Sequence, residues 1–190
     1  MTQDRHLIEE KTGSEEILRG RFLHAFRDTG RLPDGGSATR EYVVHPGAVM
    51  VVPMLDDGTL VMERQYRYPM GRVMIEFPAG KLDGPEDVLL CAKRELLEET
   101  GYTAAQWARA GQLHPVISYS TEFIDVWFCR GLTKKQAQLD EGEFLEVFTA
   151  TPQQVIDWCR DGAITDSKTL VGAWWLQNVL AGTWQLDWKP

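Results

Sequence analysis

The chain has 190 residues, enough for one domain with its own hydrophobic core, and its 43% hydrophobic and 25% charged content is ordinary for a globular protein. Its formal net charge of −8 argues against a general nucleic-acid-binding surface, because such surfaces need clustered positive charge. An acidic protein that handles an anionic ligand must therefore supply positive charge locally.

Cysteine content and apolar runs argue against further classes. The cysteines are odd in number and lack CxxC spacing, so we expect neither a disulfide framework nor a zinc site but reduced thiols: Cys91, Cys129 and Cys159. The N-terminus has no basic-then-apolar signal region, and no apolar run approaches the ~20 residues of a membrane span. We therefore expect a cytoplasmic protein without a membrane partner.

Residues 1–45 differ from residues 46–190, and we expect them to form a separate N-terminal β segment. Ile17–Phe26 and Ala38–Val44 have β-like composition, and Asp28–Ser37 between them is rich in turn-forming residues. Two or three strands without a covering helix would leave edges and an apolar face exposed. The segment must therefore pack either on the rest of the chain or on a second subunit.

Three strands are expected next. Gly47–Leu55 is a continuous apolar run, typical of a strand buried on both faces. Asp57-Gly58 is a hairpin turn signal, which makes Thr59–Arg67 the partner strand. Val73–Phe77 is a further strand, in which Glu76 points away from the face of its two neighbours.

The stretch from Gly80 to Tyr102 predicts a loop followed by a helix. Pro85 suits a first helical turn, with Glu86 in the same turn, and Gly101 supplies a left-handed stop. Apolar residues recur at helical period on one side: Val88, Leu89, Ala92 and Leu96.

Three acids share one face of this predicted helix. Glu95, Glu98 and Glu99 stand at i, i+3 and i+4, a spacing at which like charges destabilise a helix unless a cation lies among them. Their arc overlaps the edge of the apolar stripe, so we expect partial burial, and clustered carboxylates suit a hard divalent cation such as Mg²⁺. Arg94 can pair with one acid and orient it. The alternative is a solvated face with surface ion pairs.

The complete spacing favours the metal site. This stretch resembles the Nudix box of the Nudix hydrolases at every defined position. The order is Gly80, five residues, Glu86, seven residues, Arg94-Glu95-Leu96, one residue, Glu98-Glu99, one residue and Gly101-Tyr102. The resemblance implies an α/β fold, an α/β/α sandwich with a mixed sheet, with the antiparallel N-terminal β segment added to it. It also implies a loop–helix–loop that binds Mg²⁺ or Mn²⁺ and hydrolyses a diphosphate. Pro78-Ala79-Gly80 resembles the branch of ADP-ribose and nucleotide-sugar pyrophosphatases.

The same resemblance implies roles for individual residues. The metal ligands would be the backbone carbonyl of Ala79 and the carboxylates of Glu95 and Glu99. The catalytic set would comprise Arg94, Glu98, Glu99 and one glutamate of a mobile acidic loop, which is either Glu141 or Glu143. Substrate contacts are implied for Arg64, Arg67, Glu76, Gly80 and Glu122.

Simpler interpretations stay open for several of these residues. Arg64 and Arg67 could be solvated arginines on an edge strand, and Glu76 could be a solvated strand acid. The chain also departs from its relatives at Val116-Ile117-Ser118, where ADP-ribose pyrophosphatases usually carry Ser-Pro-Gly. That difference puts the identity of the substrate in doubt, but not the chemistry.

The C-terminal third predicts strands and helices that complete the domain. Trp107–Leu113, Phe123–Arg130 and Phe144–Thr149 are expected strands, and Pro152–Arg160 and Asp166–Leu180 are expected helices.

The expected function is Mg²⁺-dependent hydrolysis of a nucleoside diphosphate sugar, with ADP-ribose converted to AMP and ribose 5-phosphate. The alternatives are GDP-mannose or another nucleotide sugar or dinucleotide as substrate, or a non-catalytic nucleotide sensor. The family resemblance also favours a homodimer that shares the N-terminal segment between subunits.

Overall fold

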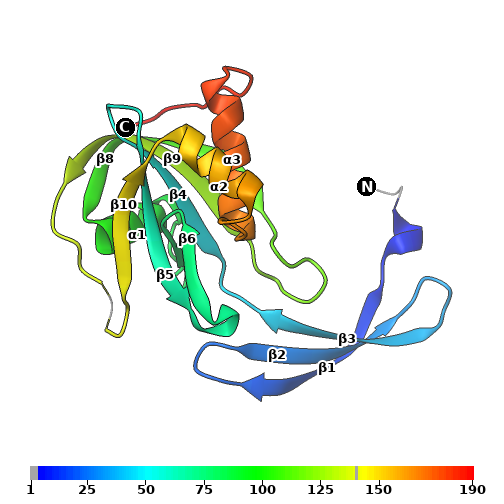
Figure 1. The fold of residues 1–190 in the computed structure, drawn as a ribbon. Helices are drawn as coiled ribbons and strands as arrows, with labels where there is room; N and C mark the ends of the chain where they lie inside the picture. The colour runs from blue at the N-terminus through cyan, green and yellow to red at the C-terminus, as the bar shows by residue number, and fades with distance from the viewer. Residues whose placement is uncertain (1–3, 140) are drawn as a thin grey trace. The chain divides into compact units, whose positions relative to one another are not determined.

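The computed structural model describes residues 4–139 and 141–190 (Figure 1). Contacts within the chain divide it into two units. The first comprises residues 4–46 together with Val116–Phe123, and the second comprises Gly47–Pro115 together with Ile124–Pro190.

The first unit is built on a three-stranded antiparallel sheet in the order β1-β2-β3. A short 3-10 helix, η1 (Arg5–Leu7), precedes the strands, which are β1 (Glu10–Arg19), β2 (His24–Arg31) and β3 (Ser37–Val44). The expected strand over Ala38–Val44 is confirmed. The strand expected over Ile17–Phe26 is wrong, because this stretch contains the turn between β1 and β2, closed by a hydrogen bond from Gly20 N to Leu23 O at 2.8 Å.

The segment Val116–Phe123 belongs to this unit through hydrogen bonds to β3. Val43 N donates to Tyr119 O at 2.9 Å, and Thr121 N donates to Val43 O at 3.0 Å. The altered loop Val116-Ile117-Ser118 therefore lies in the same unit as the N-terminal sheet.

The second unit contains a seven-stranded mixed sheet. Its main path is β10-β5-β4-β9-β8, with β6 paired to β5 and β7 paired to β4. Only the pairing of β4 with β9 is parallel among the described strands. The strands are β4 (Ala48–Met54), β5 (Leu60–Arg67), β6 (Arg72–Glu76), β7 (Ala79–Lys81), β8 (Tyr102–Leu113), β9 (Ile124–Lys134) and β10 (Leu145–Ala150), with the 3-10 helix η2 (Tyr68–Met70) between β5 and β6.

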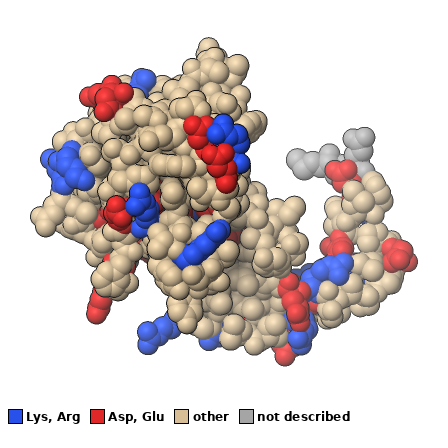
Figure 2. All heavy atoms as spheres, in the orientation of Figure 1, with Lys and Arg blue, Asp and Glu red and all other residues tan. Residues whose placement is uncertain are grey.

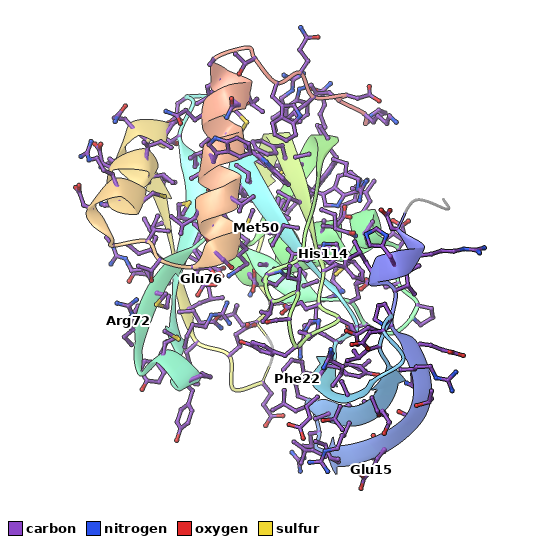
Figure 3. All side chains as sticks on the ribbon, turned by 90° about the vertical axis from the view of Figure 1, so that its right-hand side faces the viewer. Glu15, Phe22, Met50, Arg72, Glu76 and His114 are labelled. Carbon is purple, nitrogen blue, oxygen red and sulfur yellow. The ribbon has the colours of Figure 1, made fainter. Side chains whose placement is uncertain are left out.

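Helices cover both faces of this sheet. Met50 of β4 packs in one core cluster with α2 (Pro152–Asp161) and α3 (Ser167–Leu180), and Figure 3 shows Met50 beside α3. The alternate residues Val49 and Val51 are equally buried and point to the opposite face, because side chains alternate along a strand. That face is covered by α1 (Val88–Thr100). The expected α/β/α sandwich with a mixed sheet is confirmed.

The helix α1 begins later than the sequence predicted. Asp87 is its N-cap, because the Asp87 carboxylate accepts hydrogen bonds from Leu89 N at 2.9 Å and Leu90 N at 3.2 Å. Glu86 therefore lies in the preceding loop, and its predicted place in the first helical turn is wrong. Gly101 ends the helix with φ of 69°, as predicted.

The described residues contain no helix that is long and apolar enough to cross a membrane. On the face drawn in Figure 2, acidic and basic side chains of the described residues lie interspersed rather than gathered by sign.

Candidate metal-binding and catalytic site

Gly80 allows the strand β7 to pass directly against the helix α1. A Cβ atom at this position would lie 1.9 Å from Cδ of Glu95, well inside van der Waals contact. The glycine at the start of the box is therefore required by the position of the Glu95 carboxylate.

Arg94 collects the acids on one flank of α1. Its guanidinium forms ion pairs with Glu86 at 2.9 Å, Glu95 at 2.7 Å and Glu98 at 3.0 Å, and donates to the carbonyl oxygen of Lys81 at 3.1 Å. The hydrogen bond from Arg94 lowers the pKa of Glu86 to about 2, although burial opposes this shift. Arg94 thus fixes the loop and the helix acids relative to each other, as expected of an orienting cation.

Glu95 and Glu99 are buried, with 9% and 4% of their surface exposed. Burial raises the pKa of Glu95 to about 7, against the opposing charge of Arg94. Burial together with the charges of Glu63, Glu95 and Glu143 raises the pKa of Glu99 to about 10. Glu99 Oε2 accepts a hydrogen bond from Ala79 N at 3.0 Å. Carboxylates crowded in this way are stabilised by a cation among them.

A further acid of this region, Glu63 on β5, was missed by the sequence analysis. Its side chain is fully buried, and neither carboxylate oxygen has a hydrogen-bond partner among the described residues. Such a buried polar atom costs about 1–3 kcal/mol. Burial and the neighbouring charge of Glu76 raise the pKa of Glu63 to about 7. The signal was available, because strand alternation in the predicted strand Thr59–Arg67 places Glu63 on the face of Arg67.

Glu76 on β6 is buried beside cations. Arg67 donates to both of its carboxylate oxygens at 2.7 Å, and Lys168 of α3 also pairs with it. Figure 3 shows Glu76 near the start of α3. Burial opposes ionisation of Glu76, yet the hydrogen bond from Arg67 and the charge of Lys168 lower its pKa. The alternative of a solvated strand acid is therefore wrong.

Arg64 lies on the opposite face of β5 from Arg67. Its guanidinium stacks 4.7 Å from the ring centre of Phe148 and pairs with Glu146 at 3.5 Å. The two arginines predicted to hold substrate are thus not brought together, because residues three apart on a strand point to opposite faces. Neither lies on an edge strand, since β5 is paired on both sides.

The structure distinguishes the two loop glutamates. Glu143 accepts a hydrogen bond from Gln65 Nε2 at 3.3 Å and raises the pKa of both Glu95 and Glu99, whereas Glu141 is exposed in a turn. The start of this loop is attached to α1, because Gln138 N donates to Glu98 O at 2.9 Å. Glu143 is therefore the loop glutamate that lies near the helix acids.

Glu98 and Glu122 are less buried than Glu95 and Glu99. Glu98 is partly exposed and held by Arg94. Glu122 belongs to the first unit, where its carboxylate lies 3.9 Å from Nε2 of His45.

The chemical type of the described residues fits a divalent cation, although their side chains are not arranged around one. Over residues 4–139 and 141–190, no group of three or more His, Cys, Asp or Glu side chains is arranged so that it could hold a metal ion. The side chains around α1 nevertheless offer carboxylate oxygens, the ligand type that Mg²⁺ prefers, and the two buried oxygens of Glu63 have no hydrogen-bond donor among the described residues. The missing side chain of Gly80 makes room for the Glu95 carboxylate itself against β7.

Comparison with known families agrees with this fold. The model of the NUDIX domain family matches residues 44–170, and the chain belongs to this family. It is a Nudix hydrolase of the kind that resembles ADP-ribose pyrophosphatases.

Among its relatives, the chain is 35% identical to the ADP-ribose pyrophosphatase of Bacillus subtilis, over 90% of this chain and 94% of the relative. It is 39% identical to the methanol dehydrogenase activator of Bacillus methanolicus, with the same coverage of both chains. A crystal structure described as an ADP compounds hydrolase superposes with a TM-score of 0.84 at 23% identity, covering 93% of this chain and 97% of that one, which shows the shared fold.

Proposed function

We propose that this protein hydrolyses the diphosphate bond of a nucleoside diphosphate sugar, and that ADP-ribose, cleaved to AMP and ribose 5-phosphate, is its main substrate. The observation that carries the proposal is the pair of buried carboxylates, Glu95 and Glu99, on the helix of a complete Nudix box. The relative named as an ADP-ribose pyrophosphatase, which matches nearly the whole chain, supports the choice of substrate.

Glu95, Glu99 and the backbone carbonyl of Ala79 would hold Mg²⁺ or Mn²⁺. The bound metal would neutralise phosphoryl oxygens and lower the pKa of an attacking water. Glu98 would assist as a further ligand or as an orienting group. Arg94 would keep Glu95 and Glu98 in place through the ion pairs that it already forms.

Glu143 is the better candidate for the group that positions the water or accepts its proton. It is the loop glutamate whose charge acts on Glu95 and Glu99, while Glu141 is exposed. The Glu143 carboxylate can act as a general base if it comes within hydrogen-bond distance of the attacking water.

Arg67 is the stronger candidate for phosphate binding. Its guanidinium is fixed by two hydrogen bonds to Glu76 and remains partly exposed, so it is oriented before the substrate arrives. Gly80 would let the substrate approach the backbone beside Glu95. Arg64, Glu76 and Glu122 remain proposed contacts with the rest of the nucleotide sugar.

A substrate panel tests this proposal. Release of products from ADP-ribose, GDP-mannose, UDP-glucose and a dinucleotide is measured with Mg²⁺ and with a chelator, for the wild type and for Glu99→Gln. We expect Mg²⁺-dependent preference for ADP-ribose and a loss of at least about a hundredfold in the variant. Near-normal turnover of Glu99→Gln at limiting Mg²⁺ would contradict the metal role. A preference for GDP-mannose would make Val116-Ile117-Ser118 the first suspect for changed specificity.

A second candidate function follows from the relative named as a methanol dehydrogenase activator. In that case the chain would act on a dehydrogenase partner. Adding the purified protein to a purified methanol dehydrogenase and measuring the rate of methanol oxidation tests this. A rate increase that Glu99→Gln also produces would favour a role independent of hydrolysis.

We also propose that the first unit forms a homodimer contact. The strand β1 is exposed along nearly its whole length, and the unit exposes Leu7, Ile8, Ile17, Leu18, Phe22 and Leu23. Light scattering is expected to give twice the chain mass, and Leu18→Asp is expected to shift it toward the monomer. A monomeric wild type would contradict this proposal.

A further inference from the structure

Glu63 is a buried acid for which the described residues provide no hydrogen-bond donor. It lies in the middle of β5, paired in register with Glu76 on β6 and with Val147 on β10. None of its surface is exposed, and within the described part of the chain both carboxylate oxygens lack a hydrogen-bond partner. Buried carboxylates in native structures are nearly always hydrogen-bonded, so this one requires an explanation.

The nearest cations are already engaged elsewhere. Arg67 directs Nε and Nη2 to Glu76, and Lys168 pairs with Glu76 and with Asp166. Their charges act on Glu63, but their hydrogen bonds go to other carboxylates. Protein side chains therefore do not complete the environment of Glu63.

Glu63 shares its surroundings with the acids of the proposed metal site. It lies on the same face of β5 as Gln65, which contacts Glu143. Its charge acts on Glu99, and the charge of Glu143 acts on both. Acids from α1, from β5 and from the loop before β10 thus converge in one region.

We propose that Glu63 is a further binding residue for the divalent cation, with its carboxylate facing the cation from the sheet. A divalent ion supplies both what Glu63 lacks, namely contacts for its two oxygens, and the positive charge that crowding with Glu99 requires. This inference rests on the metal site of the proposed function. It extends that site beyond the Nudix box to a strand that the box does not include.

Mn²⁺ binding to the purified full-length protein tests the proposal. Free Mn²⁺ is measured by electron paramagnetic resonance during titration of the wild type and of Glu63→Gln, which keeps the shape of the side chain. We expect the dissociation constant to rise about 10- to 100-fold. The increase in melting temperature caused by Mn²⁺ is expected to shrink in parallel, and that readout is independent of catalysis.

Three variants complete the test. Glu146→Gln, on the neighbouring strand β10 and exposed, is the matched control and is expected to bind Mn²⁺ like the wild type. Glu99→Gln is the positive control for lost binding. Glu63→Leu serves if the Gln variant does not fold, because an apolar side chain suits a dry buried site without the metal.

The outcomes separate this inference from the proposed function. If the wild type binds Mn²⁺ and Glu63→Gln or Glu63→Leu binds it within twofold, the inference is overturned and the proposed function stands. If the wild type hydrolyses ADP-ribose with Mn²⁺ and the Glu63 variants lose affinity, both are supported. If the wild type binds no Mn²⁺, both are overturned.

Discussion

Glu63 and Glu76 are the same residue type, directly paired on neighbouring strands, and both are buried. Their pKa values nevertheless move in opposite directions, down for Glu76 and up to about 7 for Glu63. Burial disfavours the charged form of both, and the difference lies in the hydrogen bonds from Arg67 and Lys168 that only Glu76 receives. The contrast shows that a cationic partner, rather than depth, decides whether a buried acid favours its charged or its neutral form.

Arg67→Met is expected to have the largest effect on the difference between the two acids. Glu76 loses both hydrogen bonds from the guanidinium and becomes more like Glu63. Because Arg67 is partly exposed and Lys168 still pairs with Glu76, the free energy of unfolding is expected to fall by about 3 kcal/mol, the lower end of the range for breaking a buried ion pair. Urea denaturation measures this loss. The control Arg64→Met removes a surface arginine and is expected to cost at most about 1 kcal/mol. Equal losses for the two variants would contradict the assigned difference.

Lys168→Met weakens the same ion pair but leaves Arg67 in place. We expect a smaller loss of about 1.5–3 kcal/mol, the contribution typical of a hydrogen bond to a charged group. The same urea experiment checks it. The double variant Lys168→Met/Glu76→Gln is expected to recover part of the loss, and no recovery would show that Lys168 acts through other contacts.

Gly80→Ala extends the comparison to Glu95. The added Cβ would displace the Glu95 carboxylate from its place beside β7, since the two would lie 1.9 Å apart. We expect ADP-ribose hydrolysis to fall about tenfold or more, as when the support of a metal ligand is lost. Steady-state rates over a range of Mg²⁺ concentrations measure this. Gly13→Ala, where an added Cβ would meet only Thr29 at an ordinary 3.8 Å, is a control that should leave hydrolysis unchanged.

The smallest expected effect is on the pH dependence of stability, to which Glu63 and Glu76 contribute in opposite directions. For Glu63 the folded-state pKa is raised from 4.5 to about 7, so metal-free stability falls as pH rises through this interval. The raised pKa of Glu99 extends that fall toward pH 10. The lowered pKa of Glu76 works in the opposite sense, because its contribution is lost as pH falls below 4.5.

We therefore expect the melting temperature, measured by calorimetry with a chelator present, to drop by a few degrees between about pH 5 and about pH 8. Glu63→Leu should reduce this drop, and Mn²⁺ should oppose it in the wild type. A metal-free melting temperature that rises over the same interval would contradict the raised pKa values.

The sequence was sufficient to predict the positions of site residues wherever these depend on spacing within one element. The positions of Glu95, Glu98 and Glu99 on one helix face follow from the helical period, and the mixed α/β fold follows from the resemblance of the box. The contact between Arg67 and Glu76 depends on the register of β5 with β6. That register cannot be read from the spacing of residues within either strand. The choice between Glu141 and Glu143 likewise needed the position of Gln65 on a separate strand.

The errors of the sequence analysis have local physical causes. Ile17–Phe26 was predicted as one strand because its turn, Gly20–Leu23, contains the apolar residues Phe22 and Leu23 rather than an Asn-Gly or Asp-Gly signal. The start of α1 was placed at Pro85 because proline suits a first helical turn. Asp87 competes more strongly, since its carboxylate caps two backbone N–H groups.

The hydrogen bond from Gln138 N to Glu98 O attaches the start of the loop before β10 to the helix α1. Glu143 follows that anchor by five residues, a length that spans at most about 18 Å when fully extended. On its other side β10 begins at Leu145, two residues after Glu143, and is paired with β5. The loop is therefore short and attached at both ends. This restricts Glu143 to positions near α1, whose acids it would assist in catalysis.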